Sequence, residues 1–411
     1  MSMFDHMEEA WSLDRNPFSQ AAVSADREPW SADVYPQELA DFQQKVVRGA
    51  LQGNRQMTFL WSQGAGNDTG YGKTRLMRHT VEEVNKRDWG EAVQVATGMK
   101  PERTTRIAAA FSELNTNLRT GLYPVIFNAV LGMAAGPAAP LRRAREAVVA
   151  ELSTDAPEAI RAKLLETRAA VAPTSDPVRV DVLDAFCRSA DELYEHLASR
   201  TPTLQLRSGL EFLHFALIAL RAAGVEKLFL MIDQLEDLAT NKALAASKRK
   251  REIGRIRDLL ETQPFAGMLH QTFTFHATAA RELETFWEQN RLPNYEATPA
   301  NQSSVIVLRG LRDDDQVAAL LAAWMEPHRT RDVEDELLPF DRDALTVLRT
   351  VAQGRLGPLL SRANELIDAG AMQQVGRIDG DFARDHLAGT AVLADGDAGE
   401  DYAADVEDLL A

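Results

Sequence analysis

The sequence predicts an α/β fold: a parallel sheet that carries a large helical insertion and is followed by a small helical domain. Two observations favour this fold. Short apolar runs bounded by polar and glycine residues recur along the chain, as buried strands do. The first of these runs is followed by a glycine-rich segment, a helical pattern and another apolar run. This order is typical of parallel strands joined by crossover helices.

Each element has its own signal in the sequence. In residues 1–35, Trp11, Asn16-Pro17-Phe18 and Trp30 lie among polar residues. We expect this segment to be an irregular arm that packs onto the next domain. A helix is expected from Pro36, because apolar residues recur at helical spacing until Gly53-Asn54 ends the run. The expected strands are 57–62, 92–97, 227–232, 271–277 and 304–308, with a helix at 75–86 between the first two.

The domain boundaries follow from changes in this pattern. Residues 36–311 form the α/β core. Within it, residues from about 100 to 225 are rich in alanine and helical in spacing, so we expect a helical insertion there. Three helical patterns predict a three-helix lid over 312–372. The remaining segment, 373–411, ends in an acidic tail that has no basic residue between 395 and 408.

Composition excludes several classes of protein. A single cysteine, Cys187, rules out a disulfide framework and suits a reducing cytoplasm. The apolar stretch 122–135 is too short to span a bilayer, which takes about 20 residues, and the first residues do not resemble a signal peptide. The net charge of −16 argues against a surface made largely for DNA. We therefore expect a cytoplasmic protein whose nucleic-acid contacts, if any, are local.

The main motif lies between the strand 57–62 and the following helix. Its residues are Asn67, Asp68, Thr69, Gly70, Tyr71, Gly72, Lys73 and Thr74, followed by Arg75. A triphosphate needs converging backbone N–H groups, a helix N-terminus, a lysine and a hydroxyl for Mg²⁺, and Gly72-Lys73-Thr74 at the start of a helix supplies them. Asn67 replaces the usual first glycine, but asparagine tolerates a left-handed backbone. The alternative is a glycine-rich turn with a chance lysine.

A second candidate site is Asp233, at the end of the apolar run 227–232. A strand that ends in an aspartate places a carboxylate at the C-terminal edge of a parallel sheet, where it can hold the water shell of Mg²⁺ beside Thr74. The alternative is an ordinary buried strand followed by a solvated turn. No histidine or acid cluster has the spacing of a further metal site.

These motifs together resemble the AAA+ P-loop ATPases, in particular the bacterial branch that includes initiator-like, STAND-like and transposition-regulator-like members. The resemblance rests on Asn16-Pro17-Phe18, the Walker A loop 70–74, the Walker B strand 230–238 and the lid, and it covers about 250 residues outside the insertion. It implies a P-loop NTPase sheet of the AAA+ type, binding of ATP with Mg²⁺, and assembly into an oligomer.

Two positions depart from the family pattern. Gln234 stands where many members have the glutamate that activates water, and an amide can position water but cannot take its proton. We expect Glu236 to be the replacement carboxylate, with slow hydrolysis as the alternative. The arginine that a lid usually offers to the nucleotide is replaced by Gly357, so the candidates are Arg355 and Arg362.

The resemblance also implies two further site residues. Thr278 occupies the position of the family's first sensor, between the phosphate loop and the Walker B acid. His276 is the second candidate, and a core histidine is the favoured interpretation of that residue. Arg291 lies where subunits present an arginine finger to a neighbour's nucleotide, with Arg281 second. Solvated surface arginines are the plain alternative for both.

A basic helix is the candidate DNA contact. The segment 242–257 includes Lys248, Arg249, Lys250 and Arg251 and only one acid, Glu252, so it could grip phosphates or simply be a solvated helix face. We expect a nucleotide-dependent oligomer that switches a partner, on DNA in a mobile-element, plasmid or defence setting. The alternatives are a STAND-like signalling switch, with the insertion or acidic tail as its protein contact, and a scaffold that binds nucleotide without hydrolysis.

Overall fold

The computed structural model describes most of the chain, as two compact units. The lid unit comprises Met1–Pro36, Thr69–Gly72 and Arg309–Ala411, and the sheet unit comprises Gln37–Asp68 and Lys73–Leu308. The described residues are 2–18, 34–42, 46, 51, 57–62, 71–86, 106–114, 121–136, 138–171, 179–200, 202–235, 238, 245–260, 267–274, 284–294 and 304–394. None of the described helices has the length and apolarity needed to cross a bilayer.

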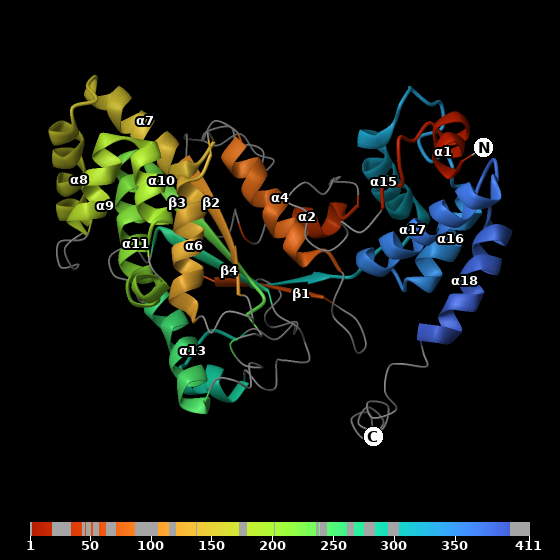
Figure 1. Cartoon of the computed structure of the whole chain (residues 1–411). Helices are drawn as coiled ribbons and strands as arrows, with labels where there is room; N and C mark the ends of the chain where they lie inside the picture. Colours follow the sequence, from red (N-terminus) through yellow and green to blue (C-terminus); the bar gives the residue numbers. More distant parts are fainter. Residues whose placement is uncertain are drawn as a thin grey trace. The chain divides into compact units, whose positions relative to one another are not determined.

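The sheet unit is built on a parallel sheet (Figure 1). Its strands are β1 Met57–Ser62, β2 Arg106–Glu113, β3 Val225–Asp233, β4 Leu269–Thr274 and β5 Val305–Leu308. They lie in the order β2-β3-β4-β1-β5, and every pairing is parallel. The predicted α/β fold is confirmed. β4 lies between β1, which precedes the phosphate loop, and β3, which ends in Asp233.

β2 was not predicted as a strand. The expected strand 92–97 lies outside the described residues. The prediction of a helical insertion from about residue 100 is wrong over 106–113, because these residues form β2. Their run of alanines has high helix propensity, but pairing with β3 overrides it. β2 lies at one end of the described sheet, and Asn85 of α4 (Lys73–Lys86) contacts its outer edge. The Asn85 amide donates to Ala109 O at 2.8 Å and accepts from Ala109 N at 3.2 Å.

The insertion is helical after β2. Its helices are α6 Leu122–Ala134, α7 Pro140–Leu152, α8 Pro157–Val171, α9 Val180–Arg188, α10 Ala190–Ala198 and α11 Pro202–Ala222. Figure 1 shows α6 and α11 on one side of the sheet and α4 on the other. Aromatic pairs hold the helices together: the rings of Phe127 and Phe212 lie 4.9 Å apart, and those of Phe186 and Phe215 lie 5.5 Å apart. Cys187 is buried among these helices, as expected for a core residue.

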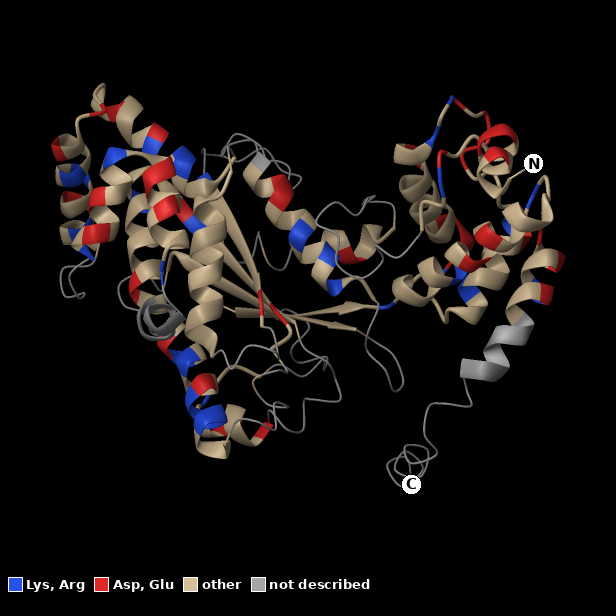
Figure 2. Ribbon diagram, viewed as in Figure 1, with Lys and Arg blue, Asp and Glu red and all other residues tan. Residues whose placement is uncertain are grey.

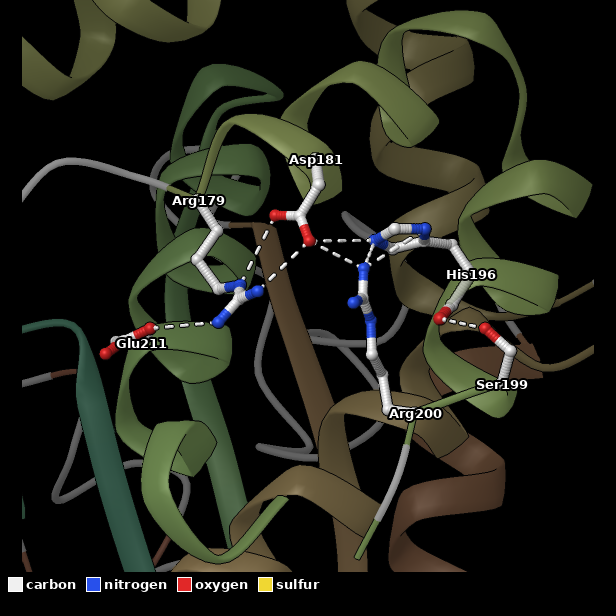
Figure 3. A network of polar contacts seen from close by, with 6 residues as sticks. All are labelled: Arg179, Asp181, His196, Ser199, Arg200 and Glu211. Carbon is white, nitrogen blue, oxygen red and sulfur yellow. Dashed lines mark hydrogen bonds and ion pairs between the residues drawn. The ribbon is translucent and has the colours of Figure 1, made fainter. Parts of the chain in front are cut away.

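A polar network joins α9, α10 and α11 (Figure 3). The Asp181 carboxylate accepts from Arg179 at 3.1 Å and from Arg200 at 2.6 Å, and Arg179 also lies 3.6 Å from Glu211. Burial opposes ionisation of Asp181, but the hydrogen bond from Arg179 and the charges of Arg179 and Arg200 lower its pKa. Burial and the charge of Arg200 lower the pKa of His196, which lies 3.4 Å from Asp181.

In the described part of the lid unit, three α-helices lie in the segment predicted as the lid. α15 Asp314–Met325, α16 Arg342–Val351 and α17 Leu356–Gln373 lie within 312–372. α18 Gly380–Ala394 follows in the segment 373–411 and packs on α16. This helix was not predicted.

The N-terminal arm begins with a helix, so its predicted irregular character is wrong over α1 Met3–Trp11. A capping box starts α1: the Ser2 hydroxyl accepts from Asp5 N, and the Asp5 carboxylate accepts from Ser2 N. Trp11 is fully buried and its indole donates to Val375 O at 3.1 Å. Several contacts of the arm are thus with C-terminal residues more than 300 positions away in the chain, as in the Asn16–Asn364 hydrogen bond of 3.0 Å.

Candidate functional site

The described part of the phosphate loop begins at Tyr71. Asn67, Asp68, Thr69 and Gly70 lie outside the described residues. Tyr71 is buried, and its carbonyl accepts from the Tyr35 hydroxyl at 3.0 Å. Gly72 has φ +81°, a left-handed conformation that favours glycine, and α4 begins at the next residue. The chain therefore passes through a left-handed glycine directly before α4.

Lys73 is the first residue of α4, and its side chain is buried. Its ammonium donates to the hydroxyl of Ser62, the last residue of β1, at 2.9 Å. A buried ammonium is stable only with such partners. The strand end and the helix start thus bring Lys73 to the C-terminal edge of the sheet. Ser62 was not predicted as a site residue, although a serine that ends a buried strand before the loop is a usable signal.

Thr74 and Asp233 meet at the same edge. The Thr74 hydroxyl donates to Asp233 Oδ2, and Asp233 is the last residue of β3 and only 2% exposed. The other carboxylate oxygen, Oδ1, accepts from Gln234 N at 2.9 Å and from the Thr274 hydroxyl. Thr274, the last residue of β4, was not predicted as a site residue. The donors to this carboxylate among the described residues are Thr74, Gln234 and Thr274, and each lies at or next to the end of a strand or the start of a helix.

The residues at this edge fit a magnesium ion. Mg²⁺ is usually held in nucleotide sites by one or two protein oxygens together with water and substrate phosphates, and Thr74 and Asp233 offer one hydroxyl and one carboxylate. Across the described residues there is no cluster of three or more histidine, cysteine or acidic side chains that could hold a metal. The donor set therefore suits a metal that relies on a bound nucleotide for its remaining ligands.

The structure describes only some of the other predicted catalytic residues. Glu236, Thr278, His276 and Arg281 lie outside the described residues. Gln234 is exposed and has φ +60°, so the chain turns sharply directly after Asp233.

The predicted arginines differ in their surroundings. Arg75 is partly buried and lies 3.5 Å from Glu82, and Arg362 pairs with Glu365 at 2.7 Å. Arg355 stands at the N-cap position of α17, and its buried Nε has no hydrogen-bond partner in the described part of the chain. Arg291 is exposed and follows a short helix at 284–289, with φ +51°. Arg75 and Arg362 thus each have an acidic partner on their own helix.

The basic helix is α13 Ala246–Leu260, where Figure 2 shows lysines and arginines grouped. Lys250 and Arg251 are exposed, whereas Lys248 and Arg249 are partly covered and the Arg249 guanidinium lies 5.4 Å from the centre of the Phe286 ring. Glu252 is buried, and its carboxylate accepts from Leu122 N of α6 at 2.9 Å. The four predicted basic residues therefore do not form one uniform surface.

Comparisons with known proteins add little to this geometry. No family model matches the chain, and no curated protein matches it. Among solved structures, the chain is similar to the ORC2 protein of Aeropyrum pernix, determined in ADPNP–ADP complexes. The two share 13% sequence identity over 91% of this chain and 71% of that chain, with a TM-score of 0.44. A likeness of this degree leaves the activity to be argued from the residues of this chain.

Proposed function

We propose that this chain is an AAA+ P-loop protein that binds ATP with Mg²⁺, hydrolyses it slowly and assembles with nucleotide to switch a partner. One observation supports this most directly. Lys73 and Thr74 open a helix directly after β1, and the Thr74 hydroxyl is hydrogen-bonded to the aspartate that ends β3. This places a cation, a helix N-terminus, a hydroxyl and a buried carboxylate at one edge of a parallel sheet.

Each residue of this edge has a role in the proposal. The backbone of the Walker A loop, residues 67–72, binds the phosphates, and Lys73 moves from Ser62 to the outer phosphate oxygens. Thr74 and Asp233 would hold Mg²⁺, which when bound offsets the negative charge of the phosphates.

The proposed hydrolytic residues follow Asp233 and β4. Gln234 orients the attacking water and Glu236 takes its proton, which makes hydrolysis slow because the base is displaced from the usual position. Thr278 acts as the first sensor of the outer phosphate, and Arg355 is the second arginine sensor. These roles come from the AAA+ resemblance, and turnover measurements on each variant test them.

Assembly and DNA binding are the finer parts of the proposal. Arg291, which is exposed, reaches a neighbouring subunit's nucleotide, and the exposed Lys250 and Arg251 of α13 contact DNA phosphates. The setting is a mobile element, a plasmid or a defence system. A STAND-like switch would show the same ATP-dependent assembly without any effect of DNA on turnover, and a scaffold would bind nucleotide without turnover.

The test is the affinity of the Lys73→Ala variant for a fluorescent ATP analogue. The lysine's charge-assisted hydrogen bonds to phosphate are expected to be worth about 10- to 100-fold in affinity. Lys163→Ala is the matched control, because Lys163 lies in α8 and pairs with Glu151 at 2.6 Å, away from the phosphate loop. If Lys73→Ala binds the analogue as tightly as the control does, the phosphate-loop assignment is wrong.

A further inference from the structure

We propose that Thr274 is a positioning residue for metal binding: its hydroxyl fixes the Asp233 carboxylate so that Oδ2 faces Thr74 and the metal. Nothing in the sequence motifs assigns Thr274 a role. The inference rests on the proposed nucleotide and Mg²⁺ site and adds a specific residue to it.

The hydrogen bonds around Asp233 leave little freedom to its carboxylate. A threonine hydroxyl has one proton, and Thr274 gives it to Asp233 Oδ1. Thr274 Oγ1 accepts in turn from Gln234 N at 3.1 Å, and the same N–H lies 2.9 Å from Asp233 Oδ1. Oδ1 is thus held from two sides, and Oδ2 is left for the Thr74 hydroxyl. Rotation of the carboxylate would break these contacts together.

The sheet register explains why Thr274 reaches this aspartate. β3 and β4 are parallel neighbours, with Ile232 paired to Phe273, so the next residue of each strand lies at the same C-terminal edge. The left-handed backbone of Gln234 keeps its N–H directed at both side chains. That conformation is unfavourable for a residue other than glycine, and these hydrogen bonds help to hold it.

Thr272 provides a built-in comparison. It lies two residues before Thr274 on β4, so it faces the same side of the sheet, and its exposed fraction is 0% against 1% for Thr274. Its hydroxyl has no hydrogen-bond partner in the described structure. The two threonines therefore share strand, face and burial, and they differ in that Thr274 contacts Asp233.

Loss of the Thr274 hydroxyl should weaken metal binding more than nucleotide binding. Groups that hydrogen-bond to a metal ligand orient it, and removing one typically costs about 10- to 100-fold in metal affinity. Asp233 does not contact the nucleotide in the proposed site except through the metal. Nucleotide affinity without metal should therefore stay unchanged.

The experiment compares Thr274→Val, Thr274→Ser and Thr272→Val in the full chain. Mn²⁺ affinity is measured by electron paramagnetic resonance of free Mn²⁺ with ADP present, and ADP affinity is measured separately in EDTA. We expect Thr274→Val to weaken Mn²⁺ binding about tenfold or more with unchanged ADP affinity in EDTA. Thr274→Ser, which keeps the hydroxyl, and Thr272→Val should both stay within about twofold of wild type.

Two results would overturn the role of Thr274: Mn²⁺ affinity of Thr274→Val within about twofold of wild type, or an equal loss in Thr272→Val. If Thr274→Val does not fold, Thr274→Ala replaces it under the same criteria, with thermal unfolding as the check on folding. Asp233→Asn is the positive control. If it weakens Mn²⁺ binding and Thr274→Val does not, only this inference fails, whereas unchanged ADP affinity in Lys73→Ala would reject the proposed function itself.

Discussion

Replacing Glu252 by alanine is expected to destabilise the start of α6 by about 3 kcal/mol, because this buried acid has two partners. It is 1% exposed and accepts from Leu122 N, at the first turn of α6, at 2.9 Å. It also lies 2.7 Å from Arg255 Nη1. A Cβ on Gly121 would come within 2.1 Å of the carboxylate, which shows how closely the backbone approaches Glu252.

The magnitude follows from these contacts. Loss of a helix cap costs about 1 kcal/mol, and breaking a buried ion pair costs about 3 to 5 kcal/mol. The Arg255 side chain is 19% exposed, and its guanidinium lies 4.0 Å from the centre of the Tyr123 ring. Water and the ring can therefore stabilise the arginine after its acid is removed, which reduces the cost of breaking the ion pair. About 3 kcal/mol in total is the resulting expectation. Glu252→Gln keeps an oxygen for Leu122 N and should lose about half as much.

Hydrogen exchange at the amides of α6 measures this effect locally, which suits a chain of two units whose global unfolding need not be two-state. A loss of about 3 kcal/mol accelerates exchange about 100-fold. Glu151→Ala is the control, since Glu151 forms an exposed pair with Lys163 and should change exchange little. Acceleration below about threefold in Glu252→Ala, or an equal effect in Glu151→Ala, would refute the reasoning.

Three further predictions concern the insertion, the basic helix and assembly. Burial and the charge of Arg200 lower the pKa of His196 from 6.5, so on acidification His196 is protonated in the unfolded chain before it is protonated in the folded chain. The contribution of His196 to the free energy of unfolding should therefore be complete above about pH 7 and decrease as the pH drops below 6.5. His196→Gln should remove this dependence in urea unfolding between pH 7.5 and 5.5, a range above the lowered pKa of the neighbouring aspartate. Neutralising Lys250 and Arg251 should flatten the salt dependence of DNA binding by roughly two units in fluorescence anisotropy, and an unchanged slope would contradict phosphate contacts there. Arg291→Ala should reduce ATP turnover more strongly as protein concentration rises, because its proposed target is a neighbouring subunit, whereas a defect independent of concentration would count against that role.

The strands were predictable where their composition is unambiguous. Residues 57–62 and 304–308 are apolar, β-branched or aromatic in large part, and β1 and β5 lie there within a residue. β2 escaped prediction because its alanines favour a helix in isolation, and only pairing with β3 and the Asn85 amide makes them a strand. α1 escaped prediction because it is short, and its burial depends on residues of the C-terminal helices.

The sequence by itself determined the residue types of the candidate site and their local setting: a lysine and a threonine at the start of a helix after a buried strand, and an aspartate at the end of another. It did not determine which side chains meet. Thr74, Asp233 and Thr274 are separated by 159 and 41 residues, and they come together only because β4 lies between β1 and β3. Strand order depends on long-range pairing and on how the helices cover both faces, so no local pattern could have selected Thr274 over Thr272.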